Sequence, residues 1–120
     1  MVFGVFDGLH AGHKYFLTEA EKHGELIVVV ARDVEVKLLK NKTPQHDEQT
    51  RMATIREFMP EATVALGDEE QGIYAVITVH QPDMICLGHD QQALAADLQR
   101  AMDDGTIPAI AFIHVQKKGV

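Results

Sequence analysis

Gly4-Val-Phe-Asp-Gly-Leu-His-Ala-Gly-His13 is the stretch that decides the fold of this 120-residue chain. The apolar run that leads into it, residues 1–6, is typical of a buried strand. The apolar spacing that follows it, from Phe16 to Ala20, predicts the start of an amphipathic helix. The stretch is therefore a tight turn from strand to helix. Such a turn directs backbone N–H groups and the positive end of a helix dipole at its ligand, which suits a phosphate.

Two histidines and a glycine give this turn its chemistry. His10 and His13 are three residues apart, so a first helical turn places both on one side. Gly12 between them lets a ligand approach the backbone closely. An isolated pair of histidines is more often exposed on the surface without a function, or hydrogen-bonded in the core for structural reasons. A zinc site would need a third ligand at a familiar spacing, and the sequence has none, so we predict no resident metal.

The composition limits the class of protein. The chain is 46% hydrophobic and 24% charged, which predicts one globular domain spanning residues 1–120. A net charge of −7 argues against broad nucleic-acid binding. No apolar run approaches the roughly 20 residues that cross a bilayer, and the N-terminus lacks the flanks of a signal peptide. Cys86 is the single cysteine, which excludes an internal disulfide and favours the cytoplasm.

Strands and helices are predicted to alternate along the chain. The apolar runs predict strands at residues 1–6, 26–31, 62–66, 84–87 and 109–115. Helices are predicted from the first turn to about Gly24, at 48–58 with Asp47 as its cap, at 73–79 and at 91–102. This alternation predicts an α/β, single Rossmann-like domain with an open five-stranded parallel sheet and helices on both faces.

The site is predicted at one edge of that sheet. In open parallel sheets, ligands bind beyond the carboxyl ends of the strands. His10 and His13 follow the first strand, and Arg32 and Asp33 follow the second. Residues 88–91 follow the fourth strand. All three groups therefore belong to the same edge.

The opening stretch resembles the signature G-T-F-D-x-x-H-x-G-H of the cytidylyltransferase-like nucleotidyltransferases, which include glycerol-3-phosphate cytidylyltransferase and archaeal-type FAD synthetase. The fixed positions that match are Gly4, Phe6, Asp7, His10, Gly12 and His13. Val5 stands where the family usually has Thr or Ser, which removes one hydroxyl. The resemblance implies the HUP-like nucleotidyltransferase fold. It also implies transfer of a nucleoside monophosphate from CTP or ATP, with Mg²⁺, to a small phosphorylated acceptor and release of pyrophosphate.

The resemblance also implies roles for single residues. His10 and His13 contact the triphosphate and stabilise the transition state as catalytic residues. The stretch 31–44 looks like the family loop in which a lysine reaches the phosphates, and Lys40 and Lys42 are the candidates. The backbone of the turn is nucleotide-binding, at Gly4, Val5, Phe6, Asp7 and Gly12. The chemistry needs no protein nucleophile, because donors that position and stabilise the phosphates are sufficient.

Asp90, Arg51 and Asp7 have two interpretations each. Gly88 and Asp90 resemble the family segment Gly-x-Asp that holds the ribose and base, and Asp90 alternatively caps a helix. Arg51 is predicted to bind nucleotide. It lies one place later than the family arginine, however, and a shift of about 100° on the helix would put it on an outer face. Asp7 either accepts backbone N–H bonds or lies near Mg²⁺.

The last residues depart from the family pattern. The family normally continues with Arg-x-x-x-x-Ser-Thr-[Ser/Thr], whereas residues 113–120 contain no Ser/Thr cluster. Lys117 and Lys118 supply charge there or belong to a frayed terminus. A catalytically impaired nucleotide-binding module of the same fold is therefore the alternative function. The expected assembly is a homodimer, in which a partner subunit can complete the site.

Overall fold

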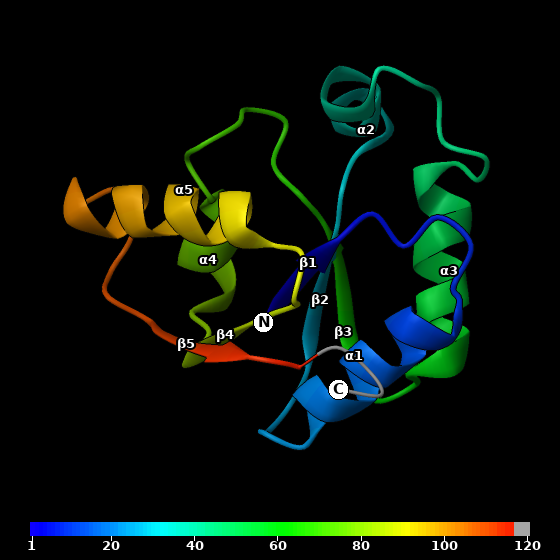
Figure 1. Cartoon of the computed structure of the whole chain (residues 1–120), viewed down its shortest axis with the longest axis horizontal. Coiled ribbons are helices and arrows are strands. Elements are labelled where there is room, and N and C mark those ends of the chain that lie inside the picture. The colour runs from blue at the N-terminus through cyan, green and yellow to red at the C-terminus, as the bar shows by residue number, and fades with distance from the viewer. Residues whose placement is uncertain (117–120) are drawn as a thin grey trace.

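The computed structural model describes residues 1–116, and Lys117 and Lys118 lie outside this range. Strands and helices alternate through the described residues, apart from two helices in succession after the second strand (Figure 1). The elements are β1 (Val2–Gly4), α1 (Ala11–Glu21), β2 (Ile27–Val30), α2 (Asp33–Lys40), α3 (Glu48–Phe58), β3 (Thr63–Leu66), α4 (Ala75–His80), β4 (Met84–Leu87), α5 (Gln92–Asp103) and β5 (Ala111–His114).

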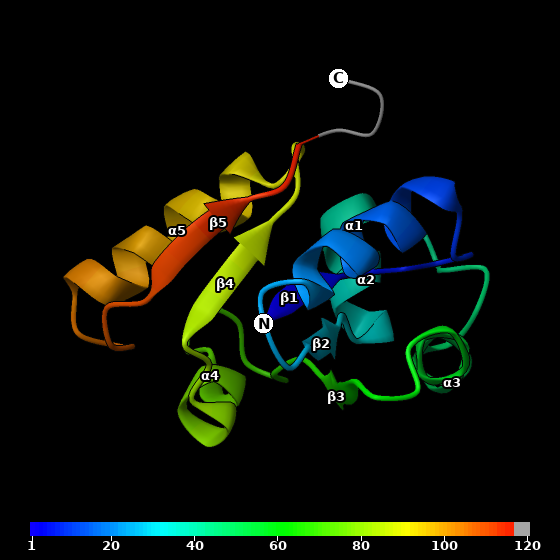
Figure 2. The same ribbon diagram turned by 90° about the horizontal axis from the view of Figure 1, so that it is seen from below.

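The strands form two small parallel sheets. One sheet has the order β1-β2-β3, and the other pairs β4 with β5. Met1 joins them, because its amino group donates to the Met84 carbonyl at 2.8 Å and its carbonyl accepts from the Cys86 amide at 3.0 Å. Figure 2 shows β4 and β5 side by side and turned away from β1–β3. The strands thus form two small sheets instead of the one open five-stranded sheet that was predicted, because β1 lies beside β4 but, within residues 1–116, only Met1 makes backbone hydrogen bonds across this junction. The parallel direction of the strands is confirmed.

Helices cover both faces of the strands, as predicted. On one face, Leu17 of α1 and Ile55 of α3 pack with Val28 in a single buried core. On the other face, Ile77 of α4 and Leu98 of α5 pack in a second core, which Val29 joins. Because successive side chains of a strand point to opposite faces, β2 supplies both cores. The continuous apolar run of this strand is explained by burial on both faces.

Helix α2 is the element that the sequence pattern missed. The basic stretch after residue 33 was expected to lead into a loop, but residues 33–40 are helical and end at Asn41 in the left-handed conformation. Val36 is its one buried residue, while Leu38 and Leu39 are exposed. The stretch is amphipathic at helical spacing, but it is only eight residues long, and its lysines and the following Thr43-Pro44 favoured a loop.

The other boundaries differ by small amounts. Helix α3 matches its predicted range, and Asp47 caps it by accepting from the Thr50 amide at 2.8 Å. Helix α1 ends at Glu21, before Gly24, and α4 begins at Ala75 rather than residue 73. Within residues 1–116, no helix combines the length and the hydropathy that would span a bilayer.

Candidate active site

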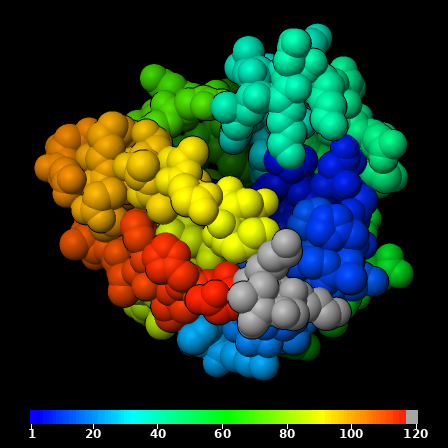
Figure 3. Space-filling view, in the orientation of Figure 1, coloured from blue at the N-terminus to red at the C-terminus, as the bar shows by residue number. Residues whose placement is uncertain are grey.

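A cleft of about 1240 Å³ opens at the carboxyl ends of β1 to β4. In Figure 3 the molecule is hollowed between the yellow atoms of α5 and the cyan atoms of α2. Ten of the predicted site residues line the cleft, namely Gly4, Val5, Phe6, Asp7, His10, Gly12, His13, Lys40, Gly88 and Asp90. Lys42 and Arg51 do not line it. The structure thus brings together three segments that are far apart in the sequence.

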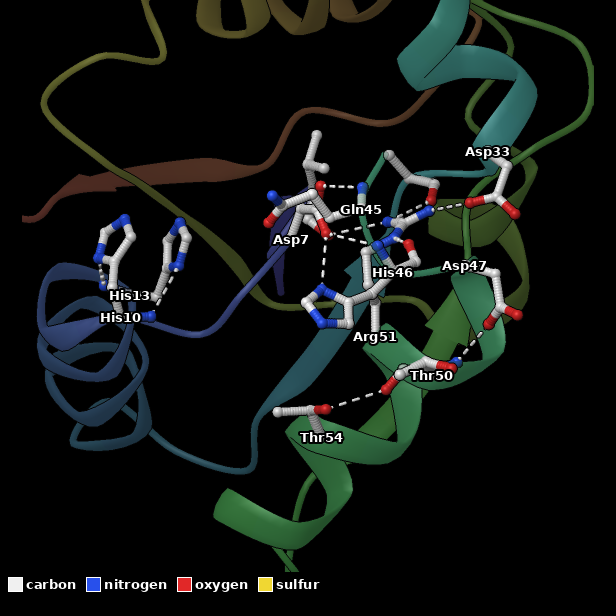
Figure 4. A network of polar contacts seen from close by, with 12 residues as sticks. Asp7, His10, His13, Asp33, Gln45, His46, Asp47, Thr50, Arg51 and Thr54 are labelled. Carbon is white, nitrogen blue, oxygen red and sulfur yellow. Dashed lines mark hydrogen bonds and ion pairs between the residues drawn. The ribbon is translucent and has the colours of Figure 1, made fainter. Parts of the chain in front are cut away.

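The two histidines form one stacked pair at the start of α1. Their ring centroids lie 3.6 Å apart with an interplanar angle of 19°. Nδ1 of His10 accepts from the amides of Gly12, at 3.0 Å, and His13, at 3.3 Å, so His10 is the N-cap of α1 (Figure 4). These two amides are therefore already bonded, which corrects the expectation that they face a phosphate directly. Because Nδ1 accepts, a neutral His10 carries its proton on Nε2.

The surroundings of His13 favour its neutral form. Burial lowers the pKa of this imidazole below the ordinary value of 6.5, and the charges of His10 and Lys40 lower it further. A hydrogen bond to the Gly8 backbone and the charge of Asp90 oppose the shift without reversing it. Lys40 and Asp90, two predicted site residues from other segments, thus act electrostatically on His13 in the cleft.

Phe6 and Gly4 explain two fixed positions of the opening stretch. Phe6 has a φ of 54°, in the left-handed region that residues other than glycine seldom adopt. This conformation brings its ring over Gly4, where an added Cβ would lie 2.6 Å from Cζ of Phe6. The same ring meets His13 edge-on, with 5.4 Å between centroids. Gly4 therefore makes room for Phe6, and Phe6 supports the His13 ring.

Asp7 anchors a distant loop. Its carboxylate accepts from the amides of Gln45, at 2.7 Å, and His46, at 2.9 Å, and it lies 3.0 Å from Nδ1 of His46 (Figure 4). Burial opposes ionisation of Asp7, but these hydrogen bonds outweigh it and hold its pKa below 3.8. Of its two readings, the structure therefore supports acceptance of backbone N–H bonds. The amides belong to the loop before α3 rather than to the turn of Asp7 itself.

Arg51 is buried, so the reading that placed it on an outer face is wrong. Its guanidinium bonds to protein groups, three of them backbone carbonyls. Lys42 lies in the loop after α2, exposed and outside the lining of the cleft. Of the two predicted lysines, the structure therefore places only Lys40 beside the histidines.

The loop after β4 is locked onto β1. The Gly88 amide donates to Oε1 of Gln91 at 2.9 Å, and Nε2 of Gln91 donates to the Phe3 carbonyl at 2.8 Å. Gln91 is the N-cap position of α5 and makes no side-chain cap bond. The cap reading of Asp90 is therefore wrong. Its carboxylate is exposed and makes no hydrogen bond or ion pair within residues 1–116, which leaves it available to a ligand.

Sequence reasoning missed the opposite wall of the cleft. This wall is acidic and comes from α2, the β3–α4 loop, α4 and α5, with Glu35, Asp68, Glu70, Tyr74 and Asp97 among its residues. Asp68 caps α4 by accepting from the amides of Ala75 and Val76, and the Tyr74 hydroxyl donates to Asp97. Burial and then Asp68 raise the pKa of Glu35. The sequence pattern contained no sign of this wall, since scattered acids carry no spacing that marks a shared surface.

Comparison with known proteins agrees with this geometry. The chain matches the family model described as Cytidylyltransferase-like over residues 1–111. It is 44% identical over 105 residues to a FAD synthase of Thermoplasma acidophilum, covering 86% of this chain and 72% of that protein. It is 45% identical over 100 residues to a FAD synthase of Thermoplasma volcanium, covering 82% and 69%.

Two solved structures share the fold. A Thermoplasma volcanium structure described as a lipopolysaccharide core biosynthesis protein superposes with a TM-score of 0.84 and 37% identity, over 98% of this chain and 94% of that one. Pantothenate synthetase from Thermus thermophilus gives a TM-score of 0.59 at 14% identity, over 96% and 54%. The second likeness shows the Rossmann-like fold alone.

The fold, the histidine pair and the matches define a nucleotide-binding α/β enzyme. The chain belongs to the cytidylyltransferase-like family, as its opening stretch predicted. It is a nucleotidyltransferase.

Proposed function

We propose that this enzyme transfers the adenylyl group of ATP to FMN and forms FAD. A phosphate oxygen of FMN attacks the α-phosphorus of ATP, a new P–O bond forms, and the bond to the β-phosphate breaks with release of pyrophosphate. The curated relatives named FAD synthase support this choice of product. The observation that carries the proposal is the meeting of His10, His13 and Lys40 in one cleft.

The proposed mechanism uses hydrogen-bond donors rather than a nucleophile. Nε2–H of His10 and the His13 imidazole donate to the triphosphate, and the Lys40 ammonium adds a positive charge beside them. As the bond to the leaving group breaks, negative charge builds on the pyrophosphate, and these groups stabilise it more than they stabilise the ground state. A neutral His13 has one N–H, which in this role donates to the triphosphate in place of the Gly8 backbone and requires no buried charge.

The loop after β4 is proposed to hold the nucleoside. Gln91 fixes this loop to β1, so the Gly88 backbone has a defined place beside the histidines. The free carboxylate of Asp90 can accept from ribose hydroxyls. In this proposal the acidic wall faces the acceptor, and its carboxylates accept hydrogen bonds from the hydroxyl and N–H groups of that substrate. CTP in place of ATP remains the alternative nucleotide.

Mg²⁺ is proposed to arrive with the triphosphate and to neutralise part of its charge. Of the two carboxylates that the sequence placed near the nucleotide, Asp7 and Asp90, one fits this companion role. Both oxygens of Asp7 already accept from amides, whereas the Asp90 carboxylate is free. Mg²⁺ keeps several waters and binds mainly through phosphates, so one carboxylate is sufficient. The homodimer and the cytoplasmic location likewise stay predictions.

A product assay tests the proposed function. The protein is incubated with Mg²⁺ and either ATP or CTP, with FMN or glycerol 3-phosphate as acceptor, and pyrophosphate and the joined product are measured. FAD from ATP and FMN is expected, and His13→Ala should lose it. His23→Ala is the matched control, because His23 is exposed in the turn after α1. Pyrophosphate from CTP and glycerol 3-phosphate, with none from FMN, would contradict the proposal.

A further inference from the structure

We infer that Arg51 is a positioning residue that holds the turn before the histidines and helix α2 in fixed relation to each other. Its side chain is fully buried and does not line the cleft. It bonds to the residue that follows β1, to the residue that follows β2, to the loop before α3 and to the first residue of α2. The inference rests on the proposed roles of His13 and Lys40, because Arg51 acts through them.

The first pair of contacts fixes the backbone around Phe6. Nη1 of Arg51 donates to the Val5 carbonyl at 2.8 Å, and Nε donates to the His46 carbonyl at 3.0 Å. His46 in turn donates its amide to Asp7. Phe6 is thus held from both sides, at Val5 directly and at Asp7 through the loop. Figure 4 shows Arg51, His46 and Asp7 of this network together.

These restraints matter because Phe6 adopts an unfavourable conformation. A residue other than glycine in the left-handed region persists only where its surroundings over-determine it. The conformation places the Phe6 ring edge-on against His13. If the two restraints loosen, Phe6 can relax to a negative φ, and its ring then leaves the His13 imidazole. Arg51 therefore supports His13 without touching it.

The second pair of contacts fixes helix α2. Nη1 of Arg51 also donates to the Ala31 carbonyl at 2.9 Å, and Nη2 forms an ion pair with Asp33 at 2.7 Å. Asp33 is the first residue of α2 and Lys40 is the last. Val36 is the one buried residue of this helix, so few packing contacts hold it in place. The ion pair at Asp33 therefore contributes strongly to the position of the helix and of Lys40.

The geometry is specific to arginine. Four hydrogen bonds leave one planar guanidinium in the directions of its rigid fork, and lysine has three donors on a single nitrogen. Arg56 of the same helix offers a matched control, because it is exposed and makes no hydrogen bond or ion pair within residues 1–116. Arg51→Lys and Arg56→Lys therefore change the same chemical group in two different settings.

The test follows the histidine ring signals of the whole protein by NMR with ¹³C-labelled histidine. Arg51→Lys is expected to shift the signals of His13 and to leave those of His80 unchanged, while Arg56→Lys leaves both unchanged. In the same samples, kcat should fall about tenfold or more, with a smaller change in KM for the nucleotide. A folded Arg51→Lys protein with unaltered His13 signals and kcat would overturn the inference. A rise in KM that exceeds the fall in kcat would also overturn it, by indicating direct nucleotide contact.

A second variant decides the matter if Arg51→Lys does not fold. Asp33→Ala removes the carboxylate that ties Arg51 to α2, at a side chain that is 38% exposed, and leaves the bond from the Asp33 amide to Glu48 in place. It is expected to lower kcat, and adding Lys40→Met should then cause little further loss, because both changes remove the same contribution. Full kcat in Asp33→Ala would overturn the inference. The NMR readout needs no turnover, so a failure of the proposed FAD synthesis is distinguishable from a failure of this role.

Discussion

The two walls of the cleft differ in charge and in origin. The wall formed by α1 and the end of α2 presents imidazole and ammonium donors at His10, His13 and Lys40. The wall formed by the β3–α4 loop, α4 and α5 presents carboxylates, such as Asp68 and Asp97. In a chain with a net charge of −7, attraction to a triphosphate is therefore a local property of one wall.

The walls also differ in how they are stabilised. The donor wall depends on a strained Phe6 and on contacts from distant segments. The acidic wall is stabilised within itself, through the cap at Asp68 and the hydrogen bond from Tyr74 to Asp97. We therefore expect changes in the donor wall to affect turnover, and changes in the acidic wall to affect stability. The predictions below test that division.

The largest effect is expected at His13. His13→Ala removes a donor proposed to act on the transition state and should abolish more than about 99% of turnover, a loss of roughly 3 kcal/mol or more. The measurement is kcat/KM for pyrophosphate release, with circular dichroism to verify folding. Near-normal turnover would remove His13 from the donor wall.

Lys40 and Lys42 provide a matched pair. Lys40 lines the cleft and lowers the pKa of His13, whereas Lys42 lies outside the lining. Lys40→Met should reduce kcat/KM about tenfold, or roughly 1.4 kcal/mol, and Lys42→Met should change it little. Steady-state kinetics of both variants give the comparison. Equal losses in the two variants would show that both lysines act only through their positive charge and not through a specific position in the cleft.

Tyr74→Phe tests the acidic wall. It removes the hydroxyl that donates to Asp97 and should lower the free energy of unfolding by about 1 kcal/mol, with kcat nearly unchanged. Urea unfolding measures the first quantity and the product assay the second. Tyr15→Phe is the control, because the Tyr15 hydroxyl makes no hydrogen bond within residues 1–116. A loss of turnover larger than the loss of stability would place Tyr74 on the reaction side of the cleft.

The smallest effect concerns pH. Burial and neighbouring charge lower the pKa of His13 in the folded state, so the unfolded chain binds a proton more readily there. When the pH is above 6.5, the ordinary pKa of histidine, His13 is neutral in both states and does not lower the free energy of unfolding. As the pH falls below that value, the unfolded chain takes up the proton first, so the folded protein loses stability. The low pKa of Asp7 acts only in a more acidic range.

Urea unfolding near pH 7.5 and near pH 5.5 measures this pH-dependent loss of stability. The unaltered protein should lose more stability between the two conditions than His13→Asn does, and His23→Asn should behave like the unaltered protein. Equal losses in all three proteins would mean that His13 titrates alike in the folded and unfolded states.

The sequence by itself determined the strands, helix α3 and the edge of the fold that holds the site. These features follow from local patterns, since apolar runs mark β2 and β4 and a cap residue marks the start of α3. The prediction that His10 and His13 share one side is also met, although His10 reaches that side as the extended N-cap of α1 and not on a helical turn. The ten predicted residues that line the cleft came from these patterns together with the family resemblance, without any knowledge of long-range contacts.

Only the tertiary structure decided which residues hold that edge together. Asp7 and His46 are 39 residues apart, and Arg51 and Val5 are 46 apart, so no local period joins them. The same holds for the acidic wall and for the break between the two sheets, where the reach of Met1 decides the pairing. Local spacing fixes which way a side chain points on its own element, whereas its partner depends on how distant elements pack.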